Sequence, residues 1–428
     1  MTEPAGAAGL HVLVVGGGGR EHALAWACAR SPEVARVSCA PGNGGTAQLG
    51  SNWNVAATDA AGIAGLARAE AADLVILGPD AAVAAGVGDA LGASGISFFG
   101  PTRAAGELEI SKAFGKELMA RVGIRTAPFA VCRDPDQARR QVRLRDGPVV
   151  VKADGLALGK GAFVCQGPEE AASVIDRLMV RGALGEAGRT VIIEDRLEGP
   201  EVSLFALCDG ERAVMLPPAC DYKRALDGDL GGNTGGMGSY APPRLAPADE
   251  LNRRALAEIV APTLAEMSRL GRPFRGCLYI GGMLVGNEIN VLEYNARFGD
   301  PEAEVLLPLL SDPVPLLRAV AAGDLGLAGP PASAAACSVG VVAVREPYPE
   351  PVQEGGLIEG VADAEALGCL VFHMGTKAVA NRAVGVAGGR VLICVATGVD
   401  LRAARGAAYA GMAQIHFEGI RYRSDIAA

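Results

Sequence analysis

Short apolar runs alternate with stretches of helical periodicity over the first hundred residues of the chain. The segment GREHALAWACAR, with small and apolar residues at helical spacing, follows the first of these runs. Strands that alternate with helices are typical of an open, mostly parallel sheet with helices on its faces. The pattern therefore predicts an N-terminal α/β domain over residues 1–106, with strands that read HVLVVG from His11, VSCAPG from Val37, LVILG from Leu74 and ISFFG from Ile96.

The pattern changes after this domain. An amphipathic helix is expected from about Glu107 to Val122, and the three strand-like pieces PVVVKADG, GAFVCQ and TVIIEDRL then accompany a helix at about 169–180. This mixture is typical of a small α+β lobe, which we place at about 126–197 within a domain spanning 107–330. Beyond a Pro/Ala/Gly-rich linker the pattern predicts a C-terminal α+β domain over 331–428, with strands at 338–344, 368–373 and 390–395 and a helix at 401–413.

Polar side chains are spaced two apart along the strand-like segment VLEYNARFGDPE, which starts at Val291. Because side chains alternate faces in a strand, Glu293 and Asn295 point the same way. A carboxylate and an amide oxygen held side by side suit a hard cation such as Mg²⁺, which usually keeps phosphate oxygens as further ligands. Arg297 extends the same row and could meet phosphate charge. The alternative is a strand that leaves the core through a polar Gly-Asp-Pro turn.

A glycine-rich connection, KADGLALGKG, joins two apolar strands and begins at Lys152. Gly155, Gly159 and Gly161 allow the backbone to bend toward an anion, whose oxygens successive N–H groups can bind. Lys152 and Lys160 would bracket that anion with positive charge. The spacing is not that of a Walker A loop, because only three residues separate the glycines and a glycine follows Lys160. A flexible hairpin with solvated lysines is the alternative.

A second glycine-rich segment, GGGGREHA at residues 16–23, follows a strand and opens a helix. The N-terminus of a helix attracts anions through its free N–H groups and the positive end of its dipole. We therefore expect a phosphate site that includes Gly18 and Arg20, with a merely tight strand–helix turn as the alternative. A nicotinamide site is disfavoured, since Glu21 stands in place of the third glycine and the next strand ends without an acid for a ribose hydroxyl.

Residues 221–240, DYKRALDGDLGGNTGGMGSY, contain too much glycine for regular structure and mix acidic, basic and amide side chains. Long loops in compact domains are usually either functional or disordered, and the apolar flanks of this one favour an ordered substrate loop. Glu194 and Glu201 lie in IEDRLEGPE, which follows an apolar strand. These carboxylates could bind the amino group or the ribose hydroxyls of a nucleotide, or they are a pair of solvated acids.

The composition restricts the partners and the compartment. The chain has 428 residues, enough for several domains, and a formal net charge of −9 that argues against nucleic acid as a partner. Its ten cysteines are scattered singly, without a CxxC pair or metal-ligand spacing, as in buried thiols of a reducing compartment. No run approaches the roughly eighteen apolar residues of a membrane span, and the N-terminus lacks a basic signal region. We expect a cytoplasmic protein with no membrane partner.

Eight motifs follow one another between His11 and Asp425: GGGGREHALAW, APGNGGTA, FGPTRAAGELEISKAFGK, KADGLALGKG, GGNTGGMGSY, EYNARFGDPE, FHMGTK and GGRVL. Together they resemble the glycinamide ribonucleotide synthetase (phosphoribosylamine–glycine ligase) family of the ATP-grasp superfamily. The resemblance implies an N-terminal α/β domain, an ATP-grasp core with a mobile small lobe, and a C-terminal domain that closes the site. It also implies ATP-driven amide formation, in which glycine's carboxylate attacks the γ-phosphate and the amine of 5-phosphoribosylamine then displaces phosphate from glycyl phosphate.

The same resemblance implies roles for individual residues. Glu293 and Asn295 would hold Mg²⁺ or Mn²⁺, and Arg297 and Lys152 are the candidate catalytic residues, since phosphoryl transfer requires positioning and charge neutralisation. The residues expected to contact ATP are Lys112, Lys152, Gly155, Gly159, Lys160, Glu194, Leu197 and Glu201. Those expected to contact glycine or phosphoribosylamine are Gly18, Arg20, Asp80, Asp221, Lys223, Arg224, Asn233, Thr234 and Gly235. We expect these small molecules to be the only partners, bound by a monomer.

Five positions depart from the family pattern. Cys220 and Tyr222 stand where the family reads Gln and His, and Gly232 stands where it reads Pro. Asp80 lies in the segment that reads GPEAPL in the family, and Ile280 in the one that reads YAGLM. Such changes alter hydrogen-bonding capacity and volume, and so can alter which substrate fits. A paralogue with the same acyl-phosphate chemistry on a different carboxylate or amine is therefore the alternative function, and a non-catalytic ATP-binding module is a third.

Overall fold

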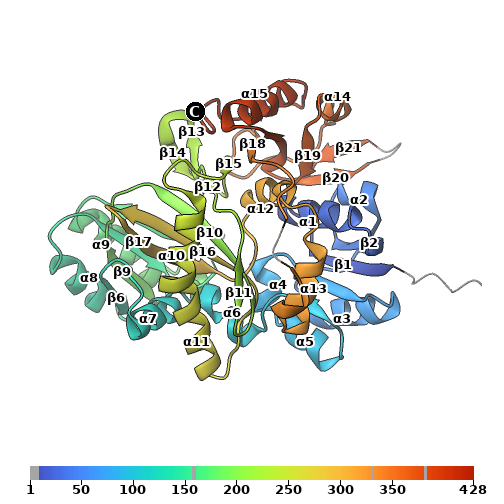
Figure 1. Ribbon diagram of the computed structural model, residues 1–428. Coiled ribbons are helices and arrows are strands. Elements are labelled where there is room, and N and C mark those ends of the chain that lie inside the picture. The colour runs from blue at the N-terminus through green and yellow to red at the C-terminus, as the bar shows by residue number, and fades with distance from the viewer. Residues whose placement is uncertain (1–8, 157–160, 330–331, 380–382) are drawn as a thin grey trace, which may run out of the picture.

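The computed structural model describes residues 9–156, 161–329, 332–379 and 383–428. Gly159 and Lys160, which the sequence places at the phosphates of ATP, lie outside the described residues. Within them the chain forms an N-terminal parallel sheet, two central lobes and a C-terminal antiparallel sheet (Figure 1). The predicted fold class is confirmed.

The N-terminal region is a five-stranded parallel sheet in the order β3-β2-β1-β4-β5. Alternate residues of β1 pack on opposite faces, Val12 and Val14 with α1 and Leu13 and Val15 with α3 and α5. This two-sided burial explains why the strand is a continuous apolar run. The elements are β1 (Leu10–Gly16), α1 (Gly19–Ala29), β2 (Val34–Pro41), α2 (Thr46–Leu49), β3 (Ser51–Asn52), α3 (Ala60–Ala69), β4 (Leu74–Leu77), α4 (Asp80–Ala84), α5 (Val87–Ala93) and β5 (Phe98–Phe99).

The expected single helix over 107–122 is wrong, because the structure has two helices, α6 (Arg103–Ile110) and α7 (Lys112–Val122). Ser111 separates them in an extended conformation, and its hydroxyl accepts a hydrogen bond from the N–H of Phe114. Asp154 accepts further hydrogen bonds from the Ser111 hydroxyl and the Ala113 N–H, each at 3.0 Å. A serine at such a position caps a new helix instead of continuing the old one.

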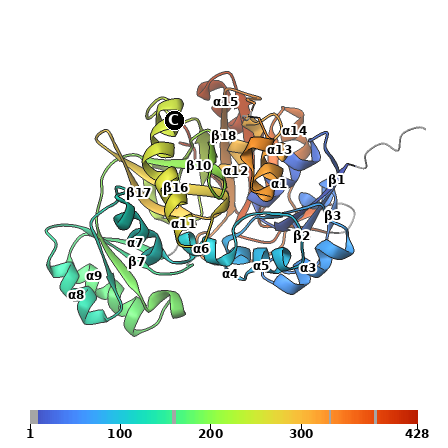
Figure 2. The ribbon, with the colours of Figure 1, turned by 60° about the horizontal axis from the view of Figure 1, so that its bottom comes forward.

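A small lobe follows α7 and projects from one end of the molecule (Figure 2). It is an antiparallel sheet in the order β6-β9-β7-β8, whose apolar face packs against two helices. The elements are β6 (Phe129–Cys132), α8 (Pro135–Arg143), β7 (Val149–Ala153), β8 (Ala162–Cys165), α9 (Pro168–Ile175) and β9 (Val191–Asp195).

The larger lobe is an antiparallel sheet in the order β11-β10-β16-β17. One face packs on α7, α10 and α11 and the other on α13, so that this sheet is the buried centre of the molecule. The elements are β10 (Glu201–Asp209), β11 (Ala213–Met215), α10 (Ala248–Ala255), α11 (Ala261–Arg269), β16 (Arg275–Val285), β17 (Glu288–Asn295), α12 (Glu302–Leu306) and α13 (Val314–Ala322).

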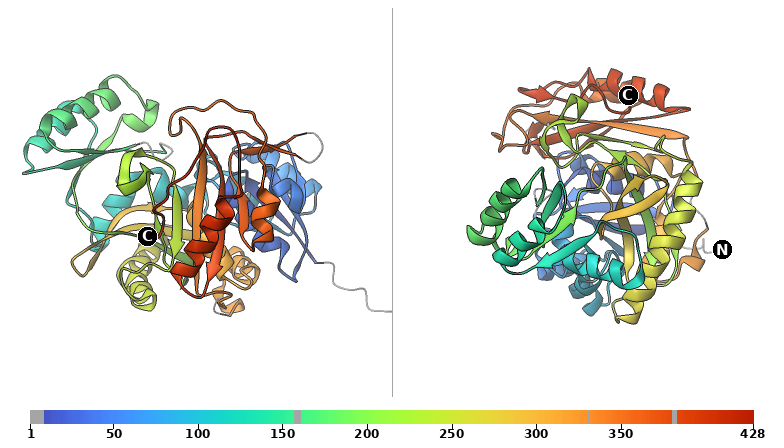
Figure 3. Two further views of the ribbon diagram at one scale, coloured as in Figure 1. Left: turned by 90° about the horizontal axis from the view of Figure 1, so that it is seen from above. Right: turned by 90° about the vertical axis from the view of Figure 1, so that its left-hand side faces the viewer.

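The C-terminal sheet draws strands from two separate parts of the chain. Its order is β12-β15-β18-β22-β19, with β23 beside β18, and β12 and β15 come from the glycine-rich segment 220–241. That segment therefore lies beside the C-terminal elements in both views of Figure 3. The remaining elements are β12 (Cys220–Asp221), β13 (Arg224–Leu226), β14 (Leu230–Asn233), β15 (Gly238–Ala241), β18 (Cys337–Arg345), α14 (Val361–Ala366), β19 (Leu370–His373), β20 (Thr376–Ala378), β21 (Val384–Val386), β22 (Arg390–Gly398), α15 (Leu401–Met412) and β23 (Ile420–Arg421).

A search of the described helices for a membrane-spanning segment finds none of sufficient length and apolarity.

Candidate active site

A cavity of about 870 Å³ lies between the sheets of the two lobes, a volume that suits a nucleotide-sized ligand. One wall comes from β7, β8 and β9 of the small lobe, and the facing wall comes from β16 and β17. Lining residues on β16 are Tyr279, Gly281 and Met283, which alternate along the strand and so share one face. The cavity is thus formed by two sheet faces that meet across the lobes.

The cavity brings together most of the residues that the sequence assigned to ATP and several assigned to the other substrates. The predicted residues that line it are Lys112, Lys152, Glu194, Leu197, Glu201, Lys223, Arg224, Asn233, Thr234 and Glu293. The described residues that were predicted for the site but do not line it are Gly18, Arg20, Asp80, Gly155, Asp221, Gly235, Asn295 and Arg297.

A buried carboxylate holds the lysine of the small lobe. Lys152 on β7 lies 2.9 Å from one oxygen of Glu194 on β9, and Lys116 on α7 lies 3.0 Å from the other. The Lys152 ammonium also donates to the carbonyl of Leu292 on β17, at 3.1 Å. Burial lowers the pKa of Lys116 to about 8, although the charge of Glu194 opposes that change. Glu194 therefore serves two lysines, and one of them spans the cavity to the larger lobe.

The predicted metal ligands lie at the end of β17. Glu293 lines the cavity, with an oxygen 3.7 Å from Lys112 Nζ. Burial raises the pKa of Glu293, but the charges of Lys112 and Lys152 outweigh it and hold that pKa below its ordinary value. The carboxylate is therefore ionised near neutral pH.

The donor set fits a cation that the nucleotide helps to bind. Asn295 is buried, and its Oδ1 accepts one hydrogen bond, at 3.1 Å from Arg297 Nη2. In the described ranges no group of three or more His, Cys, Asp or Glu side chains is placed to hold a metal ion. Two oxygen donors and phosphate oxygens together would supply the ligands that Mg²⁺ prefers. Glu293 and Asn295 fit that requirement, and they would not suffice alone.

Arg297 is placed behind this pair. Its guanidinium lies 2.8 Å from Glu109 and bonds to Asn295, and it does not line the cavity. Burial raises the pKa of Glu109, and the Arg297 charge opposes that rise. These contacts make Arg297 a support for Asn295.

The glycine-rich segment carries two cationic side chains into the cavity. Lys223 Nζ lies 2.5 Å from Glu201 and 2.9 Å from Asp221. These carboxylates hold the pKa of Lys223 well above its ordinary value against the effect of burial. Arg224 donates to Asn233 Oδ1 at 3.2 Å, so that β13 and β14 are joined by side chains as well as by their backbones. The segment is ordered, as the sequence predicted, but the expectation that it lacks regular structure is wrong. It contributes strands β12 to β15, because its backbone pairs within the hairpin and with the C-terminal sheet.

The helix N-terminus that the sequence assigned to phosphate has partners within the chain. The N–H of Gly18 donates to a carboxylate oxygen of Glu21 at 2.6 Å. Arg20 is buried, bonds to the same carboxylate and donates to the Phe298 carbonyl at 3.1 Å. Asp80, in the first turn of α4, accepts a hydrogen bond from the N–H of Ala81 at 2.9 Å. Phosphate binding at α1 stays a prediction, with Glu21 as the internal competitor for those donors.

Comparisons with known proteins identify the family. The phosphoribosylglycinamide synthetase N domain matches residues 10–109, the ATP-grasp (A) domain matches 110–303 and the C domain matches 338–428. The phosphoribosylamine–glycine ligase of Nostoc sp. is 44% identical over 421 residues, covering 97% of this chain and 99% of that protein. The ligase of Streptomyces coelicolor is 44% identical over 427 residues, covering 98% and 99%. The chain belongs to the phosphoribosylglycinamide synthetase family.

Solved structures agree with this family assignment. The crystal structure of phosphoribosylamine–glycine ligase from Thermotoga maritima matches with a TM-score of 0.82 and 33% identity, over 97% of this chain and 100% of that one. The biotin carboxylase domain of a 2-oxoglutarate carboxylase from Hydrogenobacter thermophilus, solved with MgADP, matches with a TM-score of 0.72 at 17% identity, over 96% and 91%. The second match shows the fold alone. The resemblance inferred from the motifs is confirmed.

The positions that depart from the family pattern lie away from the cavity lining of the described chain. Ile280 is fully buried on the opposite face of β16, in the core beneath the sheet. Tyr222 accepts a hydrogen bond from the N–H of Ala427 at 2.9 Å, and the Cys220 thiol donates to the carbonyl of Glu201. Gly232 is exposed on the hairpin. Asp80, the fifth departing position, does not line the cavity either, and it is itself a candidate substrate residue. The five substitutions therefore leave the lining of this cavity unchanged.

Sequence reasoning missed several residues of the site. Lys116 stands four residues after Lys112, which places both on one face of α7, and that spacing was a usable signal. The apolar lining of the cavity was also missed, because such residues look like core until the opposite sheet is known. It comprises Val150, Ala162, Val164, Met283 and Leu292.

Proposed function

We propose that this protein is an ATP-dependent ligase that joins glycine to 5-phosphoribosylamine through glycyl phosphate, giving glycinamide ribonucleotide, ADP and phosphate. The observation that carries the proposal is the cavity between the lobes, which brings Lys112, Lys152 and Glu293 to one place in a chain of this family. Two cations and one anion on facing walls suit a triphosphate and its metal ion.

ATP would lie between the two sheets. Val150 and Ala162 on one side and Met283 and Leu292 on the other provide apolar surfaces for the adenine ring. Because both oxygens of Glu194 are paired with lysines, the adenine edge would meet the backbone of residues 195–197. Glu201, at the start of β10, is the candidate for the ribose hydroxyls.

The triphosphate would meet the two lysines. Lys112 lies at the N-terminus of α7, and Lys152 is held by Glu194 and by the Leu292 carbonyl. Gly155 has a φ of +140°, a conformation that favours glycine, and it is the first glycine of the connection proposed to bind phosphate. The two lysines would neutralise and orient the γ-phosphate, which is the main requirement of phosphoryl transfer.

The metal ion would be held by Glu293 and Asn295. Mg²⁺, or Mn²⁺ in its place, would neutralise charge on the terminal phosphates when bound. Arg297 is the candidate for stabilising the transferred phosphoryl group, and its contact with Asn295 indicates that it also orients this ligand.

The anionic substrates would meet the opposite charges on the glycine-rich segment. Lys223 and Arg224 line the cavity, the charge of Lys223 acts on Glu293, and Asp221 orients Lys223. The remaining candidates for glycine and phosphoribosylamine are Asn233, Thr234, Gly235, Gly18, Arg20 and Asp80. We further propose a cytoplasmic monomer with no nucleic-acid or membrane partner, which light scattering of the pure protein and fractionation of cells would test.

A product assay tests the reaction itself. Purified protein is incubated with ATP, Mg²⁺, glycine and freshly generated phosphoribosylamine, and glycinamide ribonucleotide is measured by mass spectrometry. One ADP should be released for each product molecule. ADP release that depends on another carboxylate or amine, with no glycinamide ribonucleotide formed, would refute the proposal and favour a paralogue.

A further inference from the structure

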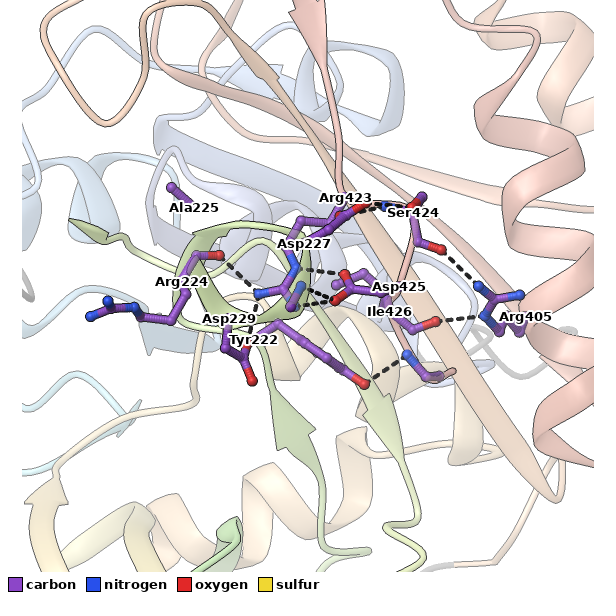
Figure 4. Close-up of polar contacts among 12 residues, drawn as sticks. Tyr222, Arg224, Ala225, Asp227, Asp229, Arg405, Arg423, Ser424, Asp425 and Ile426 are labelled. Atoms are coloured by element: carbon purple, nitrogen blue, oxygen red, sulfur yellow. Dashed lines mark hydrogen bonds and ion pairs between the residues drawn. The ribbon is translucent and has the colours of Figure 1, made fainter. Parts of the chain in front are cut away.

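The C-terminal segment 421–427 runs along the β13–β14 hairpin, which carries residues of the proposed substrate site (Figure 4). The two segments are about two hundred residues apart in the sequence, with separations of 194 to 199 for the contacts of Arg423, Ser424 and Asp425 to the hairpin. The hairpin is thus held by the far end of the chain.

Arg423 is the centre of this contact. Its side chain is 1% exposed, and its guanidinium donates to the Arg224 carbonyl at 3.0 Å and to Asp229 at 2.9 Å. Asp425 accepts two further hydrogen bonds from the same guanidinium, at 2.7 and 2.6 Å. The guanidinium carbon also lies 4.8 Å from the centre of the Tyr222 ring. Only a planar fork with several donors can serve all these partners at once.

Other residues of the segment bind the rest of the hairpin. Asp425 accepts a hydrogen bond from the Gly228 N–H at 2.8 Å. Asp227 accepts hydrogen bonds from the Ser424 N–H at 2.9 Å and from the Ser424 hydroxyl. The segment is itself anchored to α15, because Arg405 donates to the carbonyls of Ser424 and Ile426. The hairpin is therefore tied, through residues 423–426, to the C-terminal helix.

The opposite side of the hairpin faces the cavity. Lys223 and Arg224 line it, and Lys223 reaches Glu201 on the larger lobe. The carbonyl of Lys223 accepts hydrogen bonds from the N–H and the hydroxyl of Thr234, which also lines the cavity. A shift of the backbone at residues 222–225 would therefore move cationic groups at the substrate end of the cavity. The walls that would contact adenine belong to other strands.

We infer that Arg423 is a positioning residue for the substrate side of this active site. It holds the backbone of Arg224 and the ring of Tyr222, and through them it fixes Lys223 and Arg224 at the cavity. The inference rests on the proposed function in one respect, namely which substrates Lys223 and Arg224 meet. The anchoring of the hairpin does not depend on that function. Loosening the anchor weakens binding of the anionic co-substrates far more than binding of ATP, which Lys223 affects only through its ion pair with Glu201.

Limited trypsin digestion of the full-length protein tests the anchoring directly. Lys223 and Arg224 are themselves trypsin sites. Arg423→Lys keeps the charge but removes the fork, and the peptide bonds after residues 223 and 224 should be cut at least about fivefold faster than in the wild type. Arg402→Lys is the matched control, since Arg402 is exposed on α15 and also keeps a trypsin site. Unchanged cleavage in Arg423→Lys would overturn the inference.

Asp227→Ala provides a second variant that does not disturb the buried guanidinium. Asp227 is exposed and loses only its bonds to Ser424, so this variant should fold and should also be cut faster at the hairpin. Asp363→Ala is its control, because Asp363 is an exposed acid on α14. If Arg423→Lys is insoluble, Asp227→Ala alone decides between anchoring and no anchoring.

Kinetics test the link to the substrates. KM for phosphoribosylamine or glycine should rise about tenfold in Arg423→Lys, while KM for ATP stays within about twofold of the wild-type value. An equal rise in KM for ATP, or a lower melting temperature with every KM unchanged, would show that Arg423 has only a structural role. If the wild type makes no glycinamide ribonucleotide, the proposed function fails, and the digestion experiment still decides whether the tail anchors the hairpin.

Discussion

Replacing Glu194 by Gln tests the part of the site on which ATP binding is proposed to depend. Its two oxygens lie 3.0 and 2.9 Å from the ammonium groups of Lys116 and Lys152. The side chain of Glu194 is only 2% exposed, as is that of Lys116, and Lys152 is 9% exposed. The substitution keeps the shape of the residue and leaves two ammonium groups side by side without their shared anion.

The expected cost follows from this burial. Removing one partner of a buried ion pair typically costs about 3–5 kcal/mol, because the remaining charge is uncompensated. The pKa of Lys116 is already lowered to about 8, so Lys116 can release its proton and relieve part of the uncompensated charge. We therefore expect a loss at the lower end of that range, about 3 kcal/mol. Lys152 also loses the carboxylate that directs it to the cavity, and KM for ATP should rise about tenfold, equivalent to about 1.4 kcal/mol.

Urea unfolding and ATP kinetics measure these two effects. Asp195→Asn is the matched control, because Asp195 is the next residue on β9 and is also paired with a cation, Arg145 at 2.8 Å, but its side chain is 43% exposed. Exposed ion pairs contribute at most about 1 kcal/mol, so the control should change little. A loss below about 1 kcal/mol in Glu194→Gln, together with an unchanged KM for ATP, would refute the reasoning about the shared carboxylate.

Three further predictions concern the metal site and the buried lysine. Glu293→Gln should lower kcat/KM at least about a hundredfold. Glu288→Gln, at the exposed start of the same strand, is the control and should not lower it. If kcat/KM of Glu293→Gln falls less than about fivefold in saturating Mg²⁺, Glu293 is not a metal ligand. Arg297→Lys should raise the Mg²⁺ concentration for half-maximal rate several-fold, because Asn295 loses its partner, and an unchanged Mg²⁺ titration would count against that role. Because the pKa of Lys116 is lowered in the folded protein, the unfolded chain binds more protons than the folded one between about pH 8 and the ordinary pKa of lysine. The free energy of unfolding should therefore rise with pH over this range by roughly 1–3 kcal/mol. Lys116→Met should remove the rise.

Local patterns were sufficient for most elements of the fold. The helix expected at 401–413 is α15 at Leu401–Met412, and the strands expected at 338–344 and 390–395 are β18 and β22. These segments have strong periodicity, which tertiary packing reinforces. The helix expected at 107–122 failed because a single cap at Ser111, supported by the distant Asp154, overrides a continuous amphipathic pattern.

Pairing between distant segments was beyond the reach of such patterns. Nothing in the alternation of residues 220–241 shows that β12 and β15 join a sheet whose other strands begin at Cys337. Strand pairing depends on which edges meet after the chain folds, whereas periodicity records only which face of a segment is buried. The predicted domain limits come from chain order, and this shared sheet crosses them.

The order of strands and helices, the bendable glycine-rich connections and the row formed by Glu293, Asn295 and Arg297 are properties of neighbouring residues. The sequence alone determined them, and with them the family. Tertiary structure alone decided that Glu194 binds two lysines and that Glu21 bonds to the first turn of α1. A charged side chain indicates the kind of partner it requires, but packing of distant elements selects which partner lies within hydrogen-bonding distance.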